Sequence, residues 1–80
     1  MIHRQQIAAA RALLSWKREE LARQSGVSLR TLARFESGEG DITASKLDRI
    51  EEALTLEGIE FLDGGVRLER LMRRARTPGD

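Results

Sequence analysis

Apolar residues recur at helical spacing in the first part of the chain. Between residues 4 and 14, Ile7, Ala10 and Leu14 lie three or four positions apart, and additional alanines raise the helix propensity of this stretch. The pattern predicts a helix over residues 4–14, which residues 15–16 interrupt.

Two shorter helices separated by a glycine are predicted next. The first covers residues 18–24 and turns Leu21 inward. Gly26 ends it, because a chain that leaves a helix sharply commonly needs a left-handed residue, and glycine adopts that conformation without a steric penalty. Ser28 is a suitable cap for the second helix, which runs to about Glu36.

A fourth helix follows a loop rich in glycine. Residues 37–41 have the composition of a loop, and Thr43 is a suitable cap for a helix over residues 44–55. The apolar positions of this helix are Leu47, Ile50, Ala53 and Leu54.

The apolar period changes from about 3.6 to two after Gly58. Residues 59–61 and 66–68 alternate on either side of the turn residues 63–65, which predicts a small β-hairpin. Apolar residues then return to helical spacing and predict a short Arg-rich helix over 68–76. Because an isolated two-stranded hairpin is marginally stable in water, we expect the strands to pair with or pack against a second copy of the chain.

Composition limits what else the chain can be. Its 80 residues are 40% hydrophobic and 34% charged, as in one small globular domain, and scarce aromatics suit packed helices better than a β-sandwich. The absence of cysteine excludes disulfides and thiol catalysis, and the single histidine cannot build a metal site alone. We therefore expect no cofactor and no metal.

The order of the charges says more than their sum. The formal net charge is only +1, but it divides into three blocks of alternating sign. Residues 1–40 hold seven basic and four acidic side chains, or +3. Residues 41–66 hold two basic and seven acidic side chains, or −5, and residues 67–80 hold five basic and two acidic ones, or +3.

One segment carries a family resemblance. Residues 19–38 contain Leu-Ala, Gly-Val-Ser, a threonine and Glu-Ser-Gly at matched spacings. This pattern resembles the helix-turn-helix of the lambda-repressor-like (Cro and XRE type) DNA-binding proteins, over roughly residues 5–55. The resemblance implies a mainly α fold, a four- to five-helix helix-turn-helix domain over residues 1–56. A small C-terminal β-hairpin extension and the short helix would occupy residues 57–80 as a dimerisation segment.

The resemblance also implies which residues meet DNA. The helix over 28–36 would enter the major groove, and its arginines suit bidentate pairing with guanine, which predicts a guanine-containing half-site. The implied base contacts are Ser28, Leu29, Arg30 and Arg34. The implied phosphate contacts are Lys17, Arg18, Thr31 and Ser37. The implied structural pair, Arg11 and Glu36, would tie the first helix to the third; the alternative is a plain surface contact.

Cations at helix starts point to the same function independently. Lys17, Arg18 and Arg30 lie at helix starts, where the positive end of the helix dipole disfavours cations. Cations in this place are expected at a phosphate-binding site. The alternative is an ordinary solvated face. The sequence departs from the family pattern in two places. Lys17 and Arg18 replace the usual polar cap and glutamine, and the acids Glu39 and Asp41 occupy a loop that often carries phosphate-binding residues.

The C-terminal segment supplies the candidate dimer interface. Its apolar residues are expected to meet a two-fold mate, with packing into the core of the single chain as the alternative. They are Ile59, Phe61, Leu62, Val66, Leu68, Leu71 and Met72. The C-terminal arginines could reach flanking phosphate, pair with the −5 block of a neighbour, or keep the tail soluble.

These observations predict a homodimeric, sequence-specific DNA-binding transcriptional regulator, a repressor or controller that binds an inverted repeat of double-stranded DNA. The alternative is an interaction module of the antiactivator or antitoxin kind that binds a protein partner.

An enzyme is the weakest interpretation, because no nucleophile has a base beside it in the pattern. No apolar run is long enough to span a bilayer and no signal peptide precedes the first helix, so we expect a cytoplasmic, nucleoid-associated protein without membrane or small-molecule partners.

Overall fold

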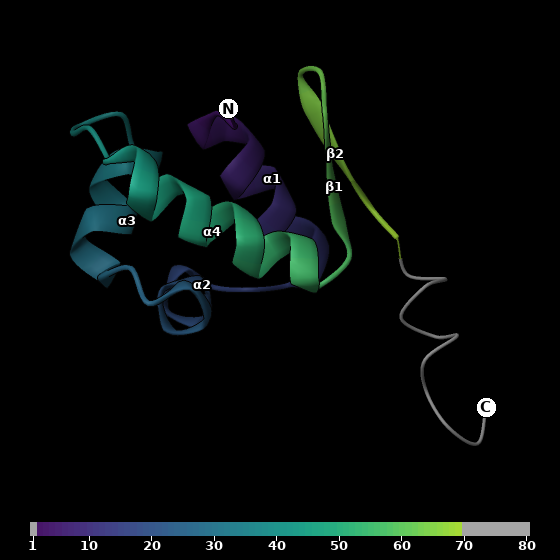
Figure 1. The fold of residues 1–80 in the computed structure, drawn as a ribbon, viewed down its shortest axis with the longest axis horizontal. Helices are drawn as coiled ribbons and strands as arrows, with labels where there is room; N and C mark the ends of the chain where they lie inside the picture. The colour runs from purple at the N-terminus through teal and green to yellow at the C-terminus, as the bar shows by residue number, and fades with distance from the viewer. Residues whose placement is uncertain (1, 70–80) are drawn as a thin grey trace.

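The computed structural model describes residues 2–69. Four helices precede one antiparallel hairpin, as the apolar pattern predicts, and the expected helix bounds are confirmed to within one residue (Figure 1). In chain order the elements are α1 (Arg4–Leu14), α2 (Arg18–Ser25), α3 (Leu29–Glu36), α4 (Ala44–Leu56), β1 (Ile59–Leu62) and β2 (Gly65–Leu68). No helix among residues 2–69 is long and apolar enough to cross a membrane.

Local signals in the sequence account for the helix ends. Gly26 adopts φ 76° at the end of α2, the left-handed conformation that the sequence predicts. The Ser28 hydroxyl accepts a hydrogen bond from the backbone N–H of Thr31 at 3.1 Å, and that of Thr43 accepts one from Lys46 at 3.2 Å. Both predicted N-caps are therefore confirmed.

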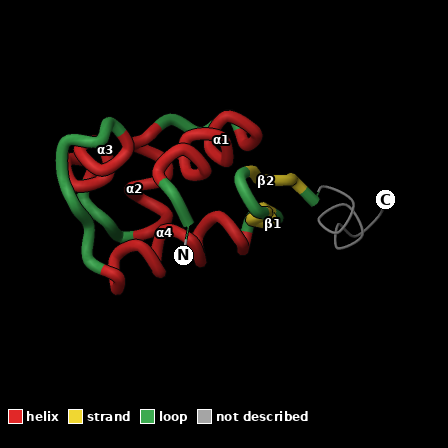
Figure 2. Tube along the Cα trace, turned by 90° about the horizontal axis from the view of Figure 1, so that it is seen from above, coloured by secondary structure: helices red, strands yellow, loops and turns green. Residues whose placement is uncertain are grey.

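The core forms where the four helices converge. Each helix contributes a side chain without solvent exposure, and the hairpin closes one side of the same cluster. The largest of these side chains are Ile7, Leu21, Leu32, Ile50 and Leu54. The helix α3 and the hairpin lie at opposite ends of the long dimension of the molecule, as both the front and the top view show (Figures 1 and 2).

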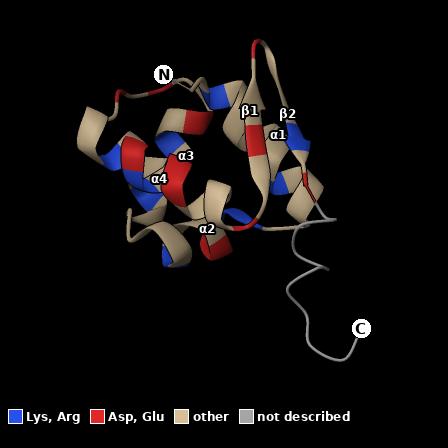
Figure 3. Cartoon of the chain, turned by 45° about the vertical axis from the view of Figure 1, so that its right-hand side comes forward, with Lys and Arg blue, Asp and Glu red and all other residues tan. Residues whose placement is uncertain are grey.

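The hairpin turns more tightly than the sequence predicts. Leu62 pairs with Gly65 and Ile59 with Leu68, so only residues 63–64 form the turn, and Gly65 belongs to the second strand. A glutamate on β1 faces an arginine on β2 on the outer side of the ribbon (Figure 3). The outer face of the hairpin therefore carries an ion pair beside the exposed Leu62.

A buried glutamine ties the hairpin to α1 of the same chain. The side-chain oxygen of Gln6 accepts a hydrogen bond from the His3 backbone N–H at 2.8 Å. Its side-chain nitrogen donates to the carbonyl oxygens of Leu62 at 2.7 Å and Gly65 at 2.9 Å. The strands thus pack on their own chain, where β2 lies against α1, and pairing with a second copy stays a prediction.

The apolar residues of the hairpin also face their own core. Ile59 is only 3% exposed and lies in the core of its own chain, which is the alternative that the sequence leaves open. Phe61, Val66 and Leu68 are half-buried against the same cluster. Leu62 is the exposed member, at 40%. The remaining predicted interface residues, Leu71 and Met72, and the helix predicted to reach residue 76, lie beyond the described residues.

Candidate nucleic-acid interface

The helices α2 and α3 form a compact wedge around a tight turn. Val27 fills the angle between them with 2% exposure, and Leu32 on α3 is fully buried. The opposite side of α3 faces solvent and carries Leu29, Arg30 and Arg34. Packing of the inner side thus decides which residues the outer side presents.

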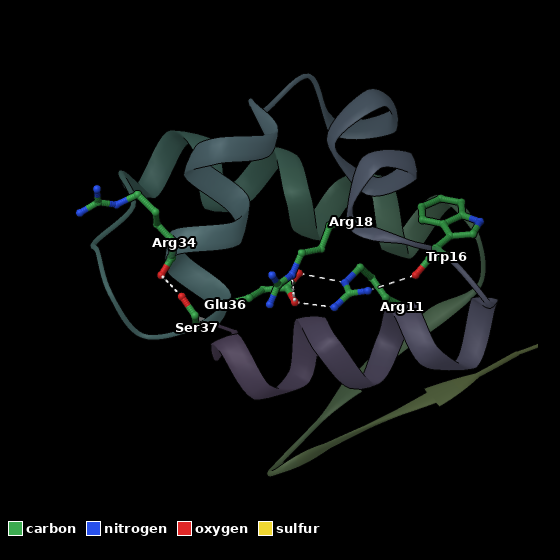
Figure 4. A network of polar contacts seen from close by, with 6 residues as sticks. All are labelled: Arg11, Trp16, Arg18, Arg34, Glu36 and Ser37. Atoms are coloured by element: carbon green, nitrogen blue, oxygen red, sulfur yellow. Dashed lines mark hydrogen bonds and ion pairs between the residues drawn. The ribbon is translucent and has the colours of Figure 1, made fainter.

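Three hydroxyls expected to contact DNA form hydrogen bonds at the ends of α3. The Ser28 hydroxyl caps the helix and also lies 3.0 Å from the Thr31 hydroxyl, to which it donates. The Ser37 hydroxyl donates to the Arg34 carbonyl at 3.2 Å (Figure 4). Both serines are exposed, so they remain accessible while they hold the helix ends.

The two arginines of α3 differ in their surroundings. The side chain of Arg30 is exposed and makes no hydrogen bond or ion pair to the described part of the chain. Arg34 points away from the buried ion network, and its terminal nitrogen lies 3.4 Å from the Glu39 carbonyl (Figure 4). Neither guanidinium has a carboxylate partner within residues 2–69.

A buried ion network joins α1, α2 and α3. Glu36 ends α3 with a side chain only 1% exposed. Arg11 binds both carboxylate oxygens, from Nε at 2.9 Å and from Nη2 at 2.6 Å, and its Nη1 donates to the Trp16 carbonyl at 3.1 Å. The structure thus brings together the pair that the family resemblance implies (Figure 4).

The known families give this arrangement its context. The family model described as helix-turn-helix matches residues 7–61, which include the wedge, the ion network and most of β1. The chain belongs to this helix-turn-helix family. Its members of the lambda-repressor-like, or XRE, type are DNA-binding regulators, and the chain is one of these helix-turn-helix regulators. No curated protein and no solved structure matches the chain.

In this helix-turn-helix protein a second arginine joins the Glu36 carboxylate. Arg18, the first residue of α2, places its Nε 3.3 Å from Glu36 Oε1 and leaves 39% of its side chain exposed. Two guanidinium groups therefore share one carboxylate, and one positive charge is left over. The sequence does not reveal this contact, because residues 18 and 36 meet only through the packing of α2 on α3.

The start of α2 keeps its cationic character. Lys17 is the exposed N-cap residue and its side chain makes no capping hydrogen bond. The nearby carboxylate of Glu20 turns toward its own helix, where Gln24 and Arg23 bind it and lower its pKa. A hollow of about 430 Å³ opens between α2 and α3, and its lining is Arg11, Lys17, Arg18, Glu19, Leu29 and Ala33.

Proposed function

We propose that this helix-turn-helix protein is a homodimeric transcriptional regulator that binds an inverted-repeat operator, in the manner of a repressor or controller. The observation that carries this proposal is the outer face of α3, where Arg30 and Arg34 are exposed without a carboxylate partner in residues 2–69. A helix fits the major groove of B-DNA, and an arginine fork pairs with O6 and N7 of guanine.

The proposed contacts fall into two groups. Leu29, 41% exposed, would meet a thymine methyl, and the two arginines would read guanines. Lys17 and Arg18, with the Thr31 and Ser37 hydroxyls, would bind the flanking phosphates. Because two of these phosphate contacts are cations, binding should fall steeply as the salt concentration rises.

The dimer is proposed on the position of the hairpin. Since α3 and the hairpin lie at opposite ends of the molecule, a two-fold contact between hairpins places the two recognition helices at the outer ends of the dimer. Successive major grooves on one side of DNA are roughly 34 to 36 Å apart. In this arrangement residues 1–56 read DNA, and residues 57–80 join the subunits through strand edges and Leu62.

Selection of binding sites from random DNA tests the reading of sequence. We expect an inverted repeat with guanines in each half-site. Arg30→Ala should weaken binding to the selected site by about 1 to 3 kcal/mol and relax one position in each half-site. Arg49→Ala, which removes an exposed arginine from α4, is the matched control. Unchanged affinity and unchanged base preference in Arg30→Ala would show that α3 does not read bases.

Analytical ultracentrifugation tests the dimer. Leu62→Asp places a charge on the exposed apolar residue of the hairpin and should shift the protein toward monomer. Leu56→Asp is the control, because Leu56 is 70% exposed at the end of α4. A parent that sediments as a monomer, or a Leu62→Asp variant with the parent's mass, contradicts the hairpin interface.

The second candidate function is a protein-interaction module. The exposed acids Glu39 and Asp41 follow α3 directly, where they repel phosphate and suit a basic protein surface. This function predicts that random DNA yields no enriched sequence and that Arg30→Ala leaves DNA binding unchanged. The selection experiment therefore distinguishes the two.

A further inference from the structure

The loop after α3 contains two glycines, and each lies beneath an arginine. A Cβ atom built on Gly38 would lie 3.3 Å from Nε of Arg4. A Cβ built on Gly40 would lie 3.2 Å from Nε and 3.5 Å from Nη2 of Arg34. The two distances to Nε are shorter than ordinary van der Waals contacts, so each guanidinium occupies space that a side chain would need.

The two glycines differ in what requires them. Gly38 has φ +81°, a left-handed conformation that other residues rarely adopt, so its backbone alone accounts for it. Gly40 is not in that region, and its backbone would accept alanine without strain. Because Gly40 has no side chain, the side chain of Arg34 has room to lie against it.

A hydrogen bond also joins this guanidinium to the loop backbone. Nη2 of Arg34 donates to the Glu39 carbonyl at 3.4 Å, and the stem of Arg34 lies over Gly40, with its Cβ 3.6 Å from the built atom. The contact is to a backbone carbonyl, and neither Glu39 nor Asp41 forms an ion pair with Arg34. Arg34 thus lies against the loop backbone, and no carboxylate among residues 2–69 pairs with it.

We propose that Gly40 is a specificity-determining positioning residue, because its bare backbone lets Arg34 lie against the loop and so sets the point from which Arg34 meets a base pair. The assignment rests on the proposed DNA-binding function and deepens it. Gly40 acts through Arg34 and does not itself need to touch DNA.

The geometry of base reading makes such an effect measurable. A bidentate arginine–guanine contact needs both nitrogens within hydrogen-bond distance at once, so a displacement of a few tenths of an ångström weakens it. Stability should not fall, because Arg34 is exposed and can move. Replacing glycine by alanine at a compatible φ also restricts the unfolded chain, which favours the folded state.

Site selection and binding titrations with Gly40→Ala test the assignment. We expect affinity for the parent's selected site to fall about fivefold, with an altered preference at one position in each half-site and an unchanged unfolding midpoint. Gly40→Val, which adds more bulk, should enlarge both effects. Asp48→Glu, which adds one methylene at an exposed position of α4 outside both proposed contact surfaces, is the control.

A double variant shows whether the effect passes through Arg34. In an Arg34→Ala background, Gly40→Ala should cause no further loss of affinity. A Gly40→Ala protein that binds and selects DNA like the parent overturns the assignment and leaves the DNA-binding proposal intact. A loss that persists in the Arg34→Ala background overturns it as well. A parent that selects no DNA sequence overturns both proposals.

Discussion

The helix α3 and the hairpin both expose arginine, but only the hairpin pairs its arginine with carboxylates. Nε of Arg67 lies 3.1 Å from a carboxylate oxygen of Glu60 and 2.7 Å from one of Glu69. The hydrogen bond to Glu60, with the charges of both acids, raises the pKa of Arg67. Arg30 and Arg34 on α3 have no such partners within residues 2–69. The comparison shows that a surface is available to phosphate when its cations lack carboxylate partners, and that the number of cations does not decide this.

The ion pairs of the two regions differ in the same way. Glu36 is almost fully buried and holds two arginines, whereas Glu60 and its partner Arg67 are 46% and 57% exposed. Water screens an exposed pair, so the hairpin pair adds little to stability. Removal of one partner from a buried pair leaves a charge without compensation, which is costly.

The largest expected effect breaks the buried network. Glu36→Gln should lower the free energy of unfolding by about 3 kcal/mol, because Arg11 loses its carboxylate in a mostly buried site. Urea denaturation followed by Trp16 fluorescence measures this loss. Glu60→Gln is the control and should leave the midpoint unchanged. Equal midpoints for the two variants would show that the buried ion pair contributes no more to stability than the exposed one.

The next effect detaches the hairpin from α1. Gln6→Ala removes both donors to the β-turn carbonyls and the acceptor for the His3 N–H, and should lower the unfolding free energy by about 2 kcal/mol. Amide exchange in residues 59–68 should accelerate more than exchange in α4. The exposed neighbour Gln5 provides the control, Gln5→Ala. If hairpin amides stay protected in Gln6→Ala, the glutamine is not the anchor.

A smaller effect concerns the positive charge that remains uncompensated where Arg11 and Arg18 share the Glu36 carboxylate. Arg18→Ala should weaken binding to all DNA sequences by about 1 kcal/mol and reduce the slope of log affinity against log salt by about one. Arg23→Ala, in the same helix but paired with Glu20, should keep the parent's slope. A parent-like slope in Arg18→Ala would mean that Arg18 serves only the ion network.

The smallest effect is the pH dependence from Glu20. Its pKa is lower in the folded chain, so its contribution to stability is present above the unfolded pKa and is lost as the pH falls through the folded one. Glu20→Gln should therefore melt slightly below the parent at neutral pH and together with it in strong acid. Thermal melts across this pH range measure the difference. A difference in melting temperature between Glu20→Gln and the parent that is the same at every pH would contradict a stabilising role for the ionised Glu20.

Local signals made much of the fold predictable. The apolar spacing of α1 and α4, the left-handed Gly26 and the caps Ser28 and Thr43 all act within a few residues of the chain, so the sequence displays them directly. The exposed position of Arg30 follows from the same periodicity once Leu32 is known to face inward. These signals predict the wedge of α2 and α3 and the face that it presents.

Contacts between distant residues were not predictable in this way. Gln6 resembles any polar residue of a helix, yet packing places it beside a turn 56 residues away. Arg18 resembles a free phosphate ligand, yet it also binds Glu36. The apolar alternation of the hairpin shows that one face is buried, but it does not say whether the covering surface is a second copy or α1.

The sequence by itself determined the four helices, the hairpin and the outward face of α3, because periodicity, caps and turn residues act over a few positions. Only the tertiary structure decided which charges remain uncompensated. An ion pair or a hydrogen bond forms where packing brings donor and acceptor within about 3 Å, whatever their separation along the chain. Through that packing Arg67 is neutralised, Glu36 holds two arginines, and Arg30 and Arg34 keep their charge on the face proposed to meet DNA.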